Sequence, residues 1–181
     1  MSKMEELKRK YGLYKNEKGE YLFDTTSEEE ARIEETFQGL KGYALRPDIA
    51  DEFKAMLTCI ALLGLGDDYL MEAKLSLDID EETENRNEEI DKNLERAIVE
   101  YAKAFSVYSN KTIYFSLARA VMMRNDIITA KEFLNNYITY TQPEEYSETV
   151  TDHFQSYHLQ ILGYGSIEEL DNEINRLIKT L

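Results

Sequence analysis

The segment 113–140 has the pattern of two amphipathic helices joined by a tight turn. Its apolar residues recur three and four positions apart, which is the spacing that places side chains on one face of an α-helix. Between the two runs, Asn125 and Asp126 are short polar residues whose side-chain oxygens can accept hydrogen bonds from the first free amides of the second helix. The segment therefore predicts a helix hairpin. Its apolar positions are Ile113, Leu117, Ala118, Val121, Ile127, Ala130, Leu134, Tyr137 and Ile138.

Large and small side chains alternate in a defined order from Tyr114 to the proline that closes this stretch. The order is Tyr114, Leu117, Ala118, Val121, Asn125-Asp126, Ala130, Leu134, Tyr137 and Pro143. Because of this order of large and small side chains, the stretch 114–143 resembles a tetratricopeptide repeat. Four positions depart from that family's pattern: Ala118 and Asn125 replace the usual glycines, Tyr137 replaces a small alanine, and Pro143 falls about one residue late. The resemblance implies stacked helix pairs whose concave face holds a peptide or a partner helix.

Related helix faces lie on both sides of this stretch. They fall at Ala97, Tyr101, Ala104 and Phe105 on one side, and at Phe154, Tyr157, Ile161, Ile174, Leu177 and Ile178 on the other. The first set lies 33 residues before the matching positions of the hairpin, and the second set lies 40 residues after them. Because these two spacings differ, the array over residues 93–180 is a degenerate one. Upstream, a helix from Pro47 is expected to stop at Gly64 and Gly66, and a second helix to start at Asp67 or Asp68. The predicted fold is all-α: about six or seven helices in stacked antiparallel hairpins.

The first part of the chain, residues 1–45, is expected to form an extension of the helical-repeat domain at 46–181. The pattern of residues 1–10 is consistent with a short helical turn or a frayed end. The apolar residues on either side of the loop 16–19 are consistent with a small β-hairpin. Hydroxyl residues at 25–27, each followed by a carboxylate three positions later, predict the start of a helix. In the last part of the chain, a helix is expected from Glu144 to Leu162, then one capped by Ser166.

The net charge of −15 is concentrated in one block of the sequence. Residues 24–91 carry twenty acidic and six basic side chains. Such a field repels nucleic-acid phosphates and anionic membranes, and it attracts basic surfaces. Nucleic-acid binding is therefore not expected. The acidic charge is consistent with a partner protein that carries a basic segment, and equally with a surface that only keeps the protein soluble. No run of eighteen apolar residues and no signal-peptide core occur, which predicts a cytoplasmic protein without a membrane span.

Residues 78–91 form the most acidic part of this block and are interpreted as a solvated acidic loop, or as a frayed end that leads into a helix containing Ile90. Its carboxylates define a predicted acidic patch of Asp78, Asp80, Glu81, Glu82 and Glu84. Five acids fall in the register of a calcium-binding loop, but Thr83 occupies the position that needs glycine for the sharp turn. His153 and His158 are five residues apart on one helix and cannot chelate a metal together. We therefore expect no metal site and no cofactor.

Catalytic motifs are not recognisable in this sequence. It contains no phosphate-binding loop, no dinucleotide-binding fingerprint and no zinc-protease helix, and Cys59, the single cysteine, is expected to be a buried apolar residue. The sequence thus favours a non-enzymatic protein-binding module, an adaptor or chaperone-like protein, and leaves open whether its copies associate. The candidate partner-binding residues are Tyr101, Tyr108, Tyr114, Arg119 and Tyr157.

Two other functions remain open from the sequence. An acidic inhibitor or immunity-type protein could mimic nucleic acid and block the basic site of its target. A salt-sensitive complex that survives mutation of the groove tyrosines would indicate this function. An enzyme with a carboxylate-based site would instead need carboxyl groups with strongly raised pKa values clustered in a deep pocket.

Overall fold

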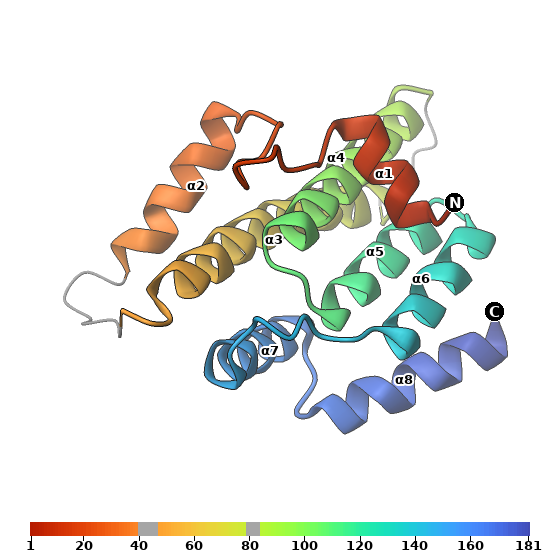
Figure 1. Ribbon diagram of the computed structural model, residues 1–181. Helices are drawn as coiled ribbons and strands as arrows, with labels where there is room; N and C mark the ends of the chain where they lie inside the picture. The colour runs from red at the N-terminus through yellow and green to blue at the C-terminus, as the bar shows by residue number, and fades with distance from the viewer. Residues whose placement is uncertain (40–46, 79–83) are drawn as a thin grey trace.

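A computed structural model describes residues 1–39, 47–78 and 84–181 of the chain. In these residues the backbone forms eight α-helices, which confirms the predicted all-α class (Figure 1). The only β pairing among them is one antiparallel bridge between Lys15 and Tyr21, with Gly19 at φ 80° in the turn, so the small hairpin is reduced to a single bridge. The helices are α1 Lys3–Tyr11, α2 Ser27–Gln38, α3 Ala50–Leu77, α4 Glu84–Val107, α5 Lys111–Met123, α6 Ile127–Thr139, α7 Glu148–Leu162 and α8 Ile167–Thr180.

Side-chain caps fix the start of several helices. Thr26 and Glu29 form a reciprocal capping box at α2, as the sequence predicts. Asp126 accepts a hydrogen bond from the Thr129 amide at 3.1 Å, which starts α6. Asn125 immediately before it has φ 61°, a left-handed conformation that asparagine tolerates better than most residues. The turn between α5 and α6 therefore lies where the sequence places it.

Helix α3 is continuous through both glycines that were expected to end it, so the predicted hairpin within residues 47–77 is wrong. A Cβ atom on Gly66 would lie 2.5 Å from Cε1 of Tyr101, and one on Gly64 would lie 2.8 Å from the Arg32 guanidinium. The glycines thus serve close packing of the side chains of α4 and α2 against the backbone of α3. The hairpin partner of α3 is α4.

The acidic run is also more ordered than predicted, because α4 begins at Glu84. The prediction of a loop is wrong for residues 84–91. Ile90 and Leu94 start the buried stripe of α4, which supplies the packing that stabilises this acidic turn. Arg86 donates hydrogen bonds to the carbonyls of Ser76 and Leu77 and so links the start of α4 to the end of α3. Residues 79–83 lie outside the described part of the chain.

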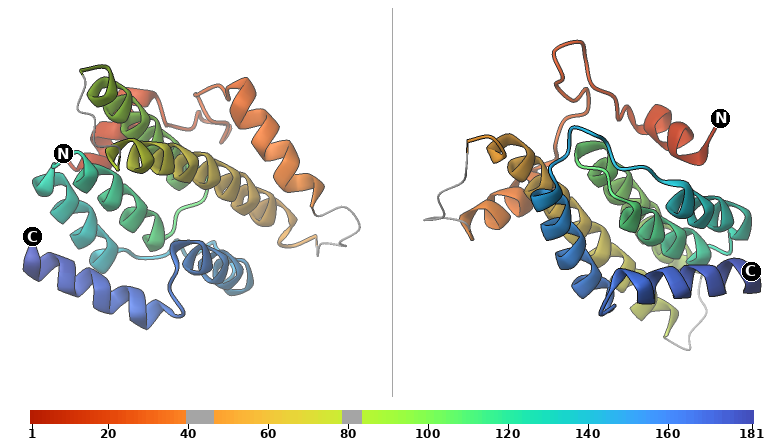
Figure 2. Two further views of the ribbon diagram at one scale, coloured as in Figure 1. Left: turned by 180° about the vertical axis from the view of Figure 1, so that it is seen from behind. Right: turned by 60° about the horizontal axis from the view of Figure 1, so that its bottom comes forward.

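Two antiparallel pairs, α3 with α4 and α5 with α6, lie side by side through contacts between α4 and α5 (Figures 1 and 2). Helix α1 packs across α4 and α6, and α2 packs on α3, so the N-terminal segment lies directly on the helical body. Met4 of α1 is buried in the same core as the other helices. The largest fully buried side chains include Leu94, Tyr101, Tyr108, Leu117, Phe133, Leu134 and Phe154.

The last two helices do not repeat the geometry of the first two pairs. Helix α7 packs on α3 and α5, whereas α8 leaves the end of α7 at a steep angle and packs on α6 (Figure 2). Leu170 and Ile174 of α8 are fully buried, and Tyr137 of α6 donates a hydrogen bond to Asp171 at 2.7 Å. Helix α7 also starts at Glu148 with Ser147 as its cap, which corrects the predicted start at Glu144.

Candidate functional site

A groove of about 740 Å³ runs between α3 and α5 and reaches the end of α7. We call it the α3–α5 groove. Its wall on α5 is formed by Arg119, Met122 and Met123, and Ile161 of α7 lies at its end. Five of its nine lining residues are apolar and four are charged. Binding sites in proteins commonly combine apolar contacts with polar groups that fix orientation. The α3 side consists of Asp67, Asp68, Leu70, Met71 and Lys74.

Exposed apolar side chains continue from this groove along α3. Met71 is 54% exposed and Leu75, one helical turn later, is 59% exposed. Ile161 on the opposite side is 53% exposed. Three of the six methionines of the chain line the groove. Methionine side chains are flexible and polarizable, so a surface rich in them can adapt to the apolar face of a partner.

The floor of the groove carries a carboxylate that two neighbouring helices hold in place. Tyr101 of α4 donates a hydrogen bond to Asp67 at 2.6 Å. Burial raises the pKa of Asp67, and the hydrogen bond from Tyr101 and the positive charge of Arg119 partly oppose that effect. Arg119 itself lies over the ring of Phe115, 5.6 Å from its centroid. At the rim, Arg32 of α2 forms a 3.2 Å ion pair with Asp68.

A smaller cavity of about 210 Å³ adjoins the groove and shares Asp67, Asp68 and Ile161 with it. Tyr157 and His158 of α7 line this cavity. His158 is 1% exposed, and its Nδ1 lies 2.7 Å from Oγ1 of Thr112. Burial and the positive charge of Arg119 lower the pKa of His158 to about 3, so its ring is neutral at physiological pH.

The structure separates the predicted partner-binding residues into core and surface positions. Tyr101 and Tyr108 are 0% and 1% exposed, so the prediction that they contact a partner is corrected: their rings fill the core. Tyr114 is half-buried with its ring 4.8 Å from that of Phe105. Arg119 lines the α3–α5 groove, and Tyr157, 45% exposed, lines the adjoining cavity.

Arg119 is the one residue of the groove lining that the sequence predicted as a partner contact. The apolar groove residues that the sequence did not indicate include the three methionines and Ile161. Met122 and Met123 end the first helix of the recognised hairpin, and Met71 lies on a helix that was expected to be interrupted. A pair of methionines at the solvent edge of an otherwise aliphatic and aromatic core is the one signal that could have indicated them. The position of Met122, Met123 and Ile161 opposite α3 depends on long-range packing, which local sequence patterns do not encode.

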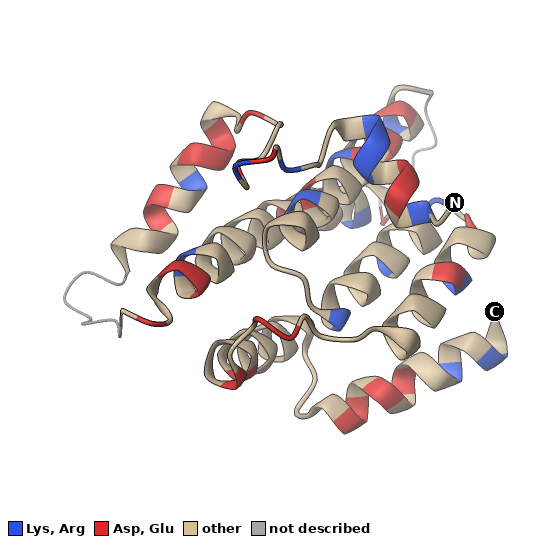
Figure 3. Ribbon diagram, in the orientation of Figure 1, with Lys and Arg blue, Asp and Glu red and all other residues tan. Residues whose placement is uncertain are grey.

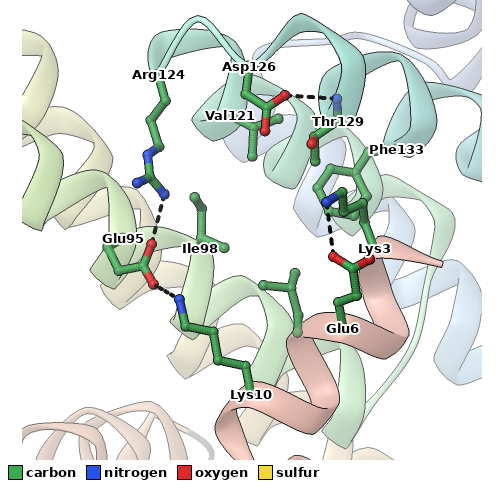
Figure 4. Close-up of a pocket in the computed structure, with 11 residues that line it drawn as sticks. Lys3, Glu6, Lys10, Glu95, Ile98, Val121, Arg124, Asp126, Thr129 and Phe133 are labelled. Atoms are coloured by element: carbon green, nitrogen blue, oxygen red, sulfur yellow. Dashed lines mark hydrogen bonds and ion pairs between the residues drawn. The ribbon is translucent and has the colours of Figure 1, made fainter. Parts of the chain in front are cut away.

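Another cavity, polar and of about 200 Å³, lies between α1, α4 and the α5–α6 turn (Figure 4). Its three cationic groups are already paired with carboxylates. Lys3 forms an ion pair with Glu6 at 2.9 Å. Glu95 forms two ion pairs, with Lys10 at 2.9 Å and with Arg124 at 2.8 Å. Of these ion pairs, Lys10 with Glu95 links α1 to α4, whereas Lys3 with Glu6 lies within α1. The cavity therefore offers a bound anion little uncompensated positive charge.

A buried ionic cluster joins α2 to α4. Glu29 and Glu100 are 1% and 7% exposed, and Lys103 binds both carboxylate oxygens of Glu29 at 2.8 and 3.0 Å. Burial raises the pKa of Glu100 to about 8, and the negative charge of Glu29 adds to that effect. For Glu29 itself, hydrogen bonds from Lys103 and from the Thr26 amide outweigh burial and lower the pKa. Both carboxyls are buried where α2 packs on the helical body, so this cluster attaches α2 to α4. Neither side chain lines one of the cavities described above.

Acidic side chains dominate the surface of α2 (Figure 3). Glu28, Glu30, Glu34 and Glu35 are all exposed there. Of the predicted acidic patch, Asp78 is exposed at the end of α3 and Glu84 begins α4, while Asp80, Glu81 and Glu82 lie outside the described residues. Within the described ranges, no group of three His, Cys, Asp or Glu side chains could hold a metal ion.

None of the helices in the described part of the chain is long and apolar enough to cross a membrane. Comparison of the chain with known protein families, with curated proteins and with solved structures finds no significant match.

Proposed function

We propose that this protein is a non-enzymatic binding module that holds an amphipathic helix of a partner protein in the α3–α5 groove. The observation that carries the proposal is the juxtaposition of Met71, Met122 and Met123 around a 740 Å³ groove. The resemblance of residues 114–143 to a tetratricopeptide repeat supports it, since such arrays use the concave side of stacked helix pairs for this purpose. Methionine-rich grooves suit the apolar anchors of a helix.

The partner helix is expected to carry basic residues beside its apolar face. Within the groove, Lys74 and Arg119 balance the charges of Asp67 and Asp68, so the negative field comes from the surroundings. Helix α7 carries Glu148 and Asp152 and no lysine or arginine, and the exposed face of the neighbouring α2 is glutamate-rich. The net charge of −15 extends this negative field beyond the contact surface. Charge complementarity of this kind accelerates encounter and selects against acidic partners.

Synthetic helical peptides test this proposal directly. One peptide has leucine on one face and lysine on the other, and a matched peptide has glutamate in place of lysine. We expect the lysine peptide to bind the wild-type protein, and Met122→Glu or Met71→Glu to weaken binding at least about tenfold, because each places a charge in the apolar contact. Ile128→Glu on α6, at a site that is 82% exposed and outside the groove, is the control and should leave binding unchanged.

The glutamate-rich face of α2 favours the second candidate function, charge mimicry of nucleic acid toward a basic site. In that case the lysine peptide would bind through α2. Neutralisation of Glu30, Glu34 and Glu35 to glutamine would abolish binding, while the groove variants would have no effect. That pattern would overturn groove binding and support the acidic-inhibitor function.

A further inference from the structure

The α3–α5 groove and the smaller cavity that adjoins it follow one face of α3. One series of their lining residues on α3 is alternately four and three positions apart, which is the spacing of a single helical face. At about 1.5 Å per residue, the series extends over about 20 Å of the helix axis. A helix held in the groove therefore lies along α3, in one of two directions. The residues of the series are Ile60, Gly64, Asp67, Met71 and Lys74.

The charges along this face differ in whether they already have a partner. Asp67 lies in the field of Arg119, which lines the same groove. Asp68 forms the 3.2 Å ion pair with Arg32 of α2. The ammonium group of Lys74 forms no hydrogen bond or ion pair with any residue in the described ranges 1–39, 47–78 and 84–181. The groove therefore offers a bound helix one uncompensated charge, which is positive, at one end of its α3 wall.

The position of Lys74 distinguishes the two directions in which a helix could lie. Lys74 is in the last turn of α3, where the free carbonyl groups carry partial negative charge. The positive N-terminal end of a second helix is stabilised beside such a turn. A carboxylate, the group that Lys74 would bind, is itself most stable in the first turn of its own helix. Both conditions are met when the first turn of the bound helix lies opposite Lys74.

We propose that Lys74 binds an acidic side chain in the first turn of the partner helix and so orients that helix antiparallel to α3. This inference rests on the proposed function of the groove and specifies the partner further. The helix carries a carboxylate beside its apolar anchors at its N-terminal end. Its basic residues lie outside this contact, toward the acidic surfaces of α2 and α7. Lys74 is thus the residue that determines the direction of binding.

Two forms of the leucine–lysine peptide test this orientation. Each has a single glutamate beside the leucine face, one in the first turn and the other in the last turn. The ratio of their Kd values is measured at low salt for the wild-type protein and for Lys74→Glu. We expect the wild type to favour the first-turn glutamate, and Lys74→Glu to shift the ratio by about fivefold toward the last-turn glutamate. Comparing ratios cancels the difference in helix content between the free peptides.

Lys54→Glu is the matched control, because Lys54 is an exposed lysine of the same helix outside both cavities. It should leave the ratio at its wild-type value. An unchanged ratio in Lys74→Glu, or a wild-type preference for the last-turn glutamate that Lys74→Glu abolishes, would overturn the orientation. If both peptides bind and Met122→Glu weakens them, that result leaves the groove function standing. If neither peptide binds, or Met122→Glu has no effect, the groove function fails and the orientation fails with it.

Discussion

The ring of Tyr101 lies directly against the backbone of Gly66, so closely that a Cβ atom on the glycine would come within 2.5 Å of the ring. This contact lets α3 and α4 approach one another without breaking α3. It also brings the Tyr101 hydroxyl within 2.6 Å of Oδ1 of Asp67, the residue that follows Gly66 on α3. The packing of one aromatic residue in the core therefore positions a carboxylate on the floor of the groove.

Gly66→Ala is expected to destabilise the protein by about 1–3 kcal/mol, because the methyl group overlaps a ring that has no room to move. Thermal and urea unfolding measure the change. Gly64→Ala in the same helix is the matched control: its methyl group meets only the end of the flexible Arg32 side chain. Since alanine favours helix by about 1 kcal/mol over glycine, this control should be neutral or stabilising. Equal losses in both variants would contradict the role assigned to Tyr101.

Glu100→Gln is expected to stabilise the protein at about pH 8 and to have much less effect at about pH 5. The pKa of Glu100 is raised from 4.5 to about 8 in the folded state, so the folded protein retains a proton that the unfolded chain releases. The stability contributed by this group is complete below pH 4.5 and is lost as the pH rises to about 8. Glutamine mimics the protonated form and removes that loss, which should raise Tm at the higher pH by about 2–4 °C for each kcal/mol regained.

Melting curves recorded across this pH range check the prediction, with Glu89→Gln as the control. Glu89 lies on the same helix but is exposed, so its neutralisation should not change the slope of Tm with pH. An unchanged slope in Glu100→Gln would show that Glu100 is ionised in the folded protein. The pKa of Glu29 is lowered, so its contribution has the opposite sign and is lost as the pH falls below 4.5.

Glu52→Ala is expected to loosen the start of α7. Both oxygens of Glu52 accept hydrogen bonds from the Ser147 amide, at 2.8 and 3.0 Å, and one accepts from the Tyr108 hydroxyl at 3.1 Å. Loss of these charge-assisted bonds should cost about 2 kcal/mol. Hydrogen exchange should then increase in the first turn of α7. The neighbouring exposed Asp51→Ala is the control, and equal exchange in both variants would count against this anchor.

Asn125→Gly should be close to neutral and Asn125→Val should be destabilising by about 1–2 kcal/mol. The residue has φ 61°, where glycine has no steric cost and a β-branched residue is strained. Chemical denaturation distinguishes the two variants. Similar stability of the valine and wild-type proteins would show that the turn can adopt another conformation.

Local sequence signals are sufficient to predict the hairpin of α5 and α6. Its turn residues, its cap at Asp126 and its two apolar stripes are encoded within thirty residues. The buried state of Cys59 is likewise predictable from its apolar neighbours and is confirmed. Such features depend on contacts close in the chain, which is why a single sequence reveals them.

Features that depend on distant residues are predicted poorly. Gly64 and Gly66 look like helix terminators until Arg32 and Tyr101, far away in sequence, explain them as points of close packing. Likewise, the cap of α7 is Ser147 and does not lie near Pro143, because Glu52 of α3 accepts a hydrogen bond from the Ser147 amide. Tyr101 and Tyr108 were expected in the groove because a helical stripe does not show which of its aromatics lie deepest.

Methionine methyl resonances provide the most direct measurement of the central claim, binding of a basic amphipathic helix in the α3–α5 groove. The protein labelled with ¹³C at the methionine methyl groups is titrated with the leucine–lysine peptide. The account predicts saturable shifts of Met71, Met122 and Met123, while Met1 and the buried Met4 and Met56 stay unchanged. Absence of shifts at the three groove methionines, or equal shifts with the leucine–glutamate peptide, would contradict it.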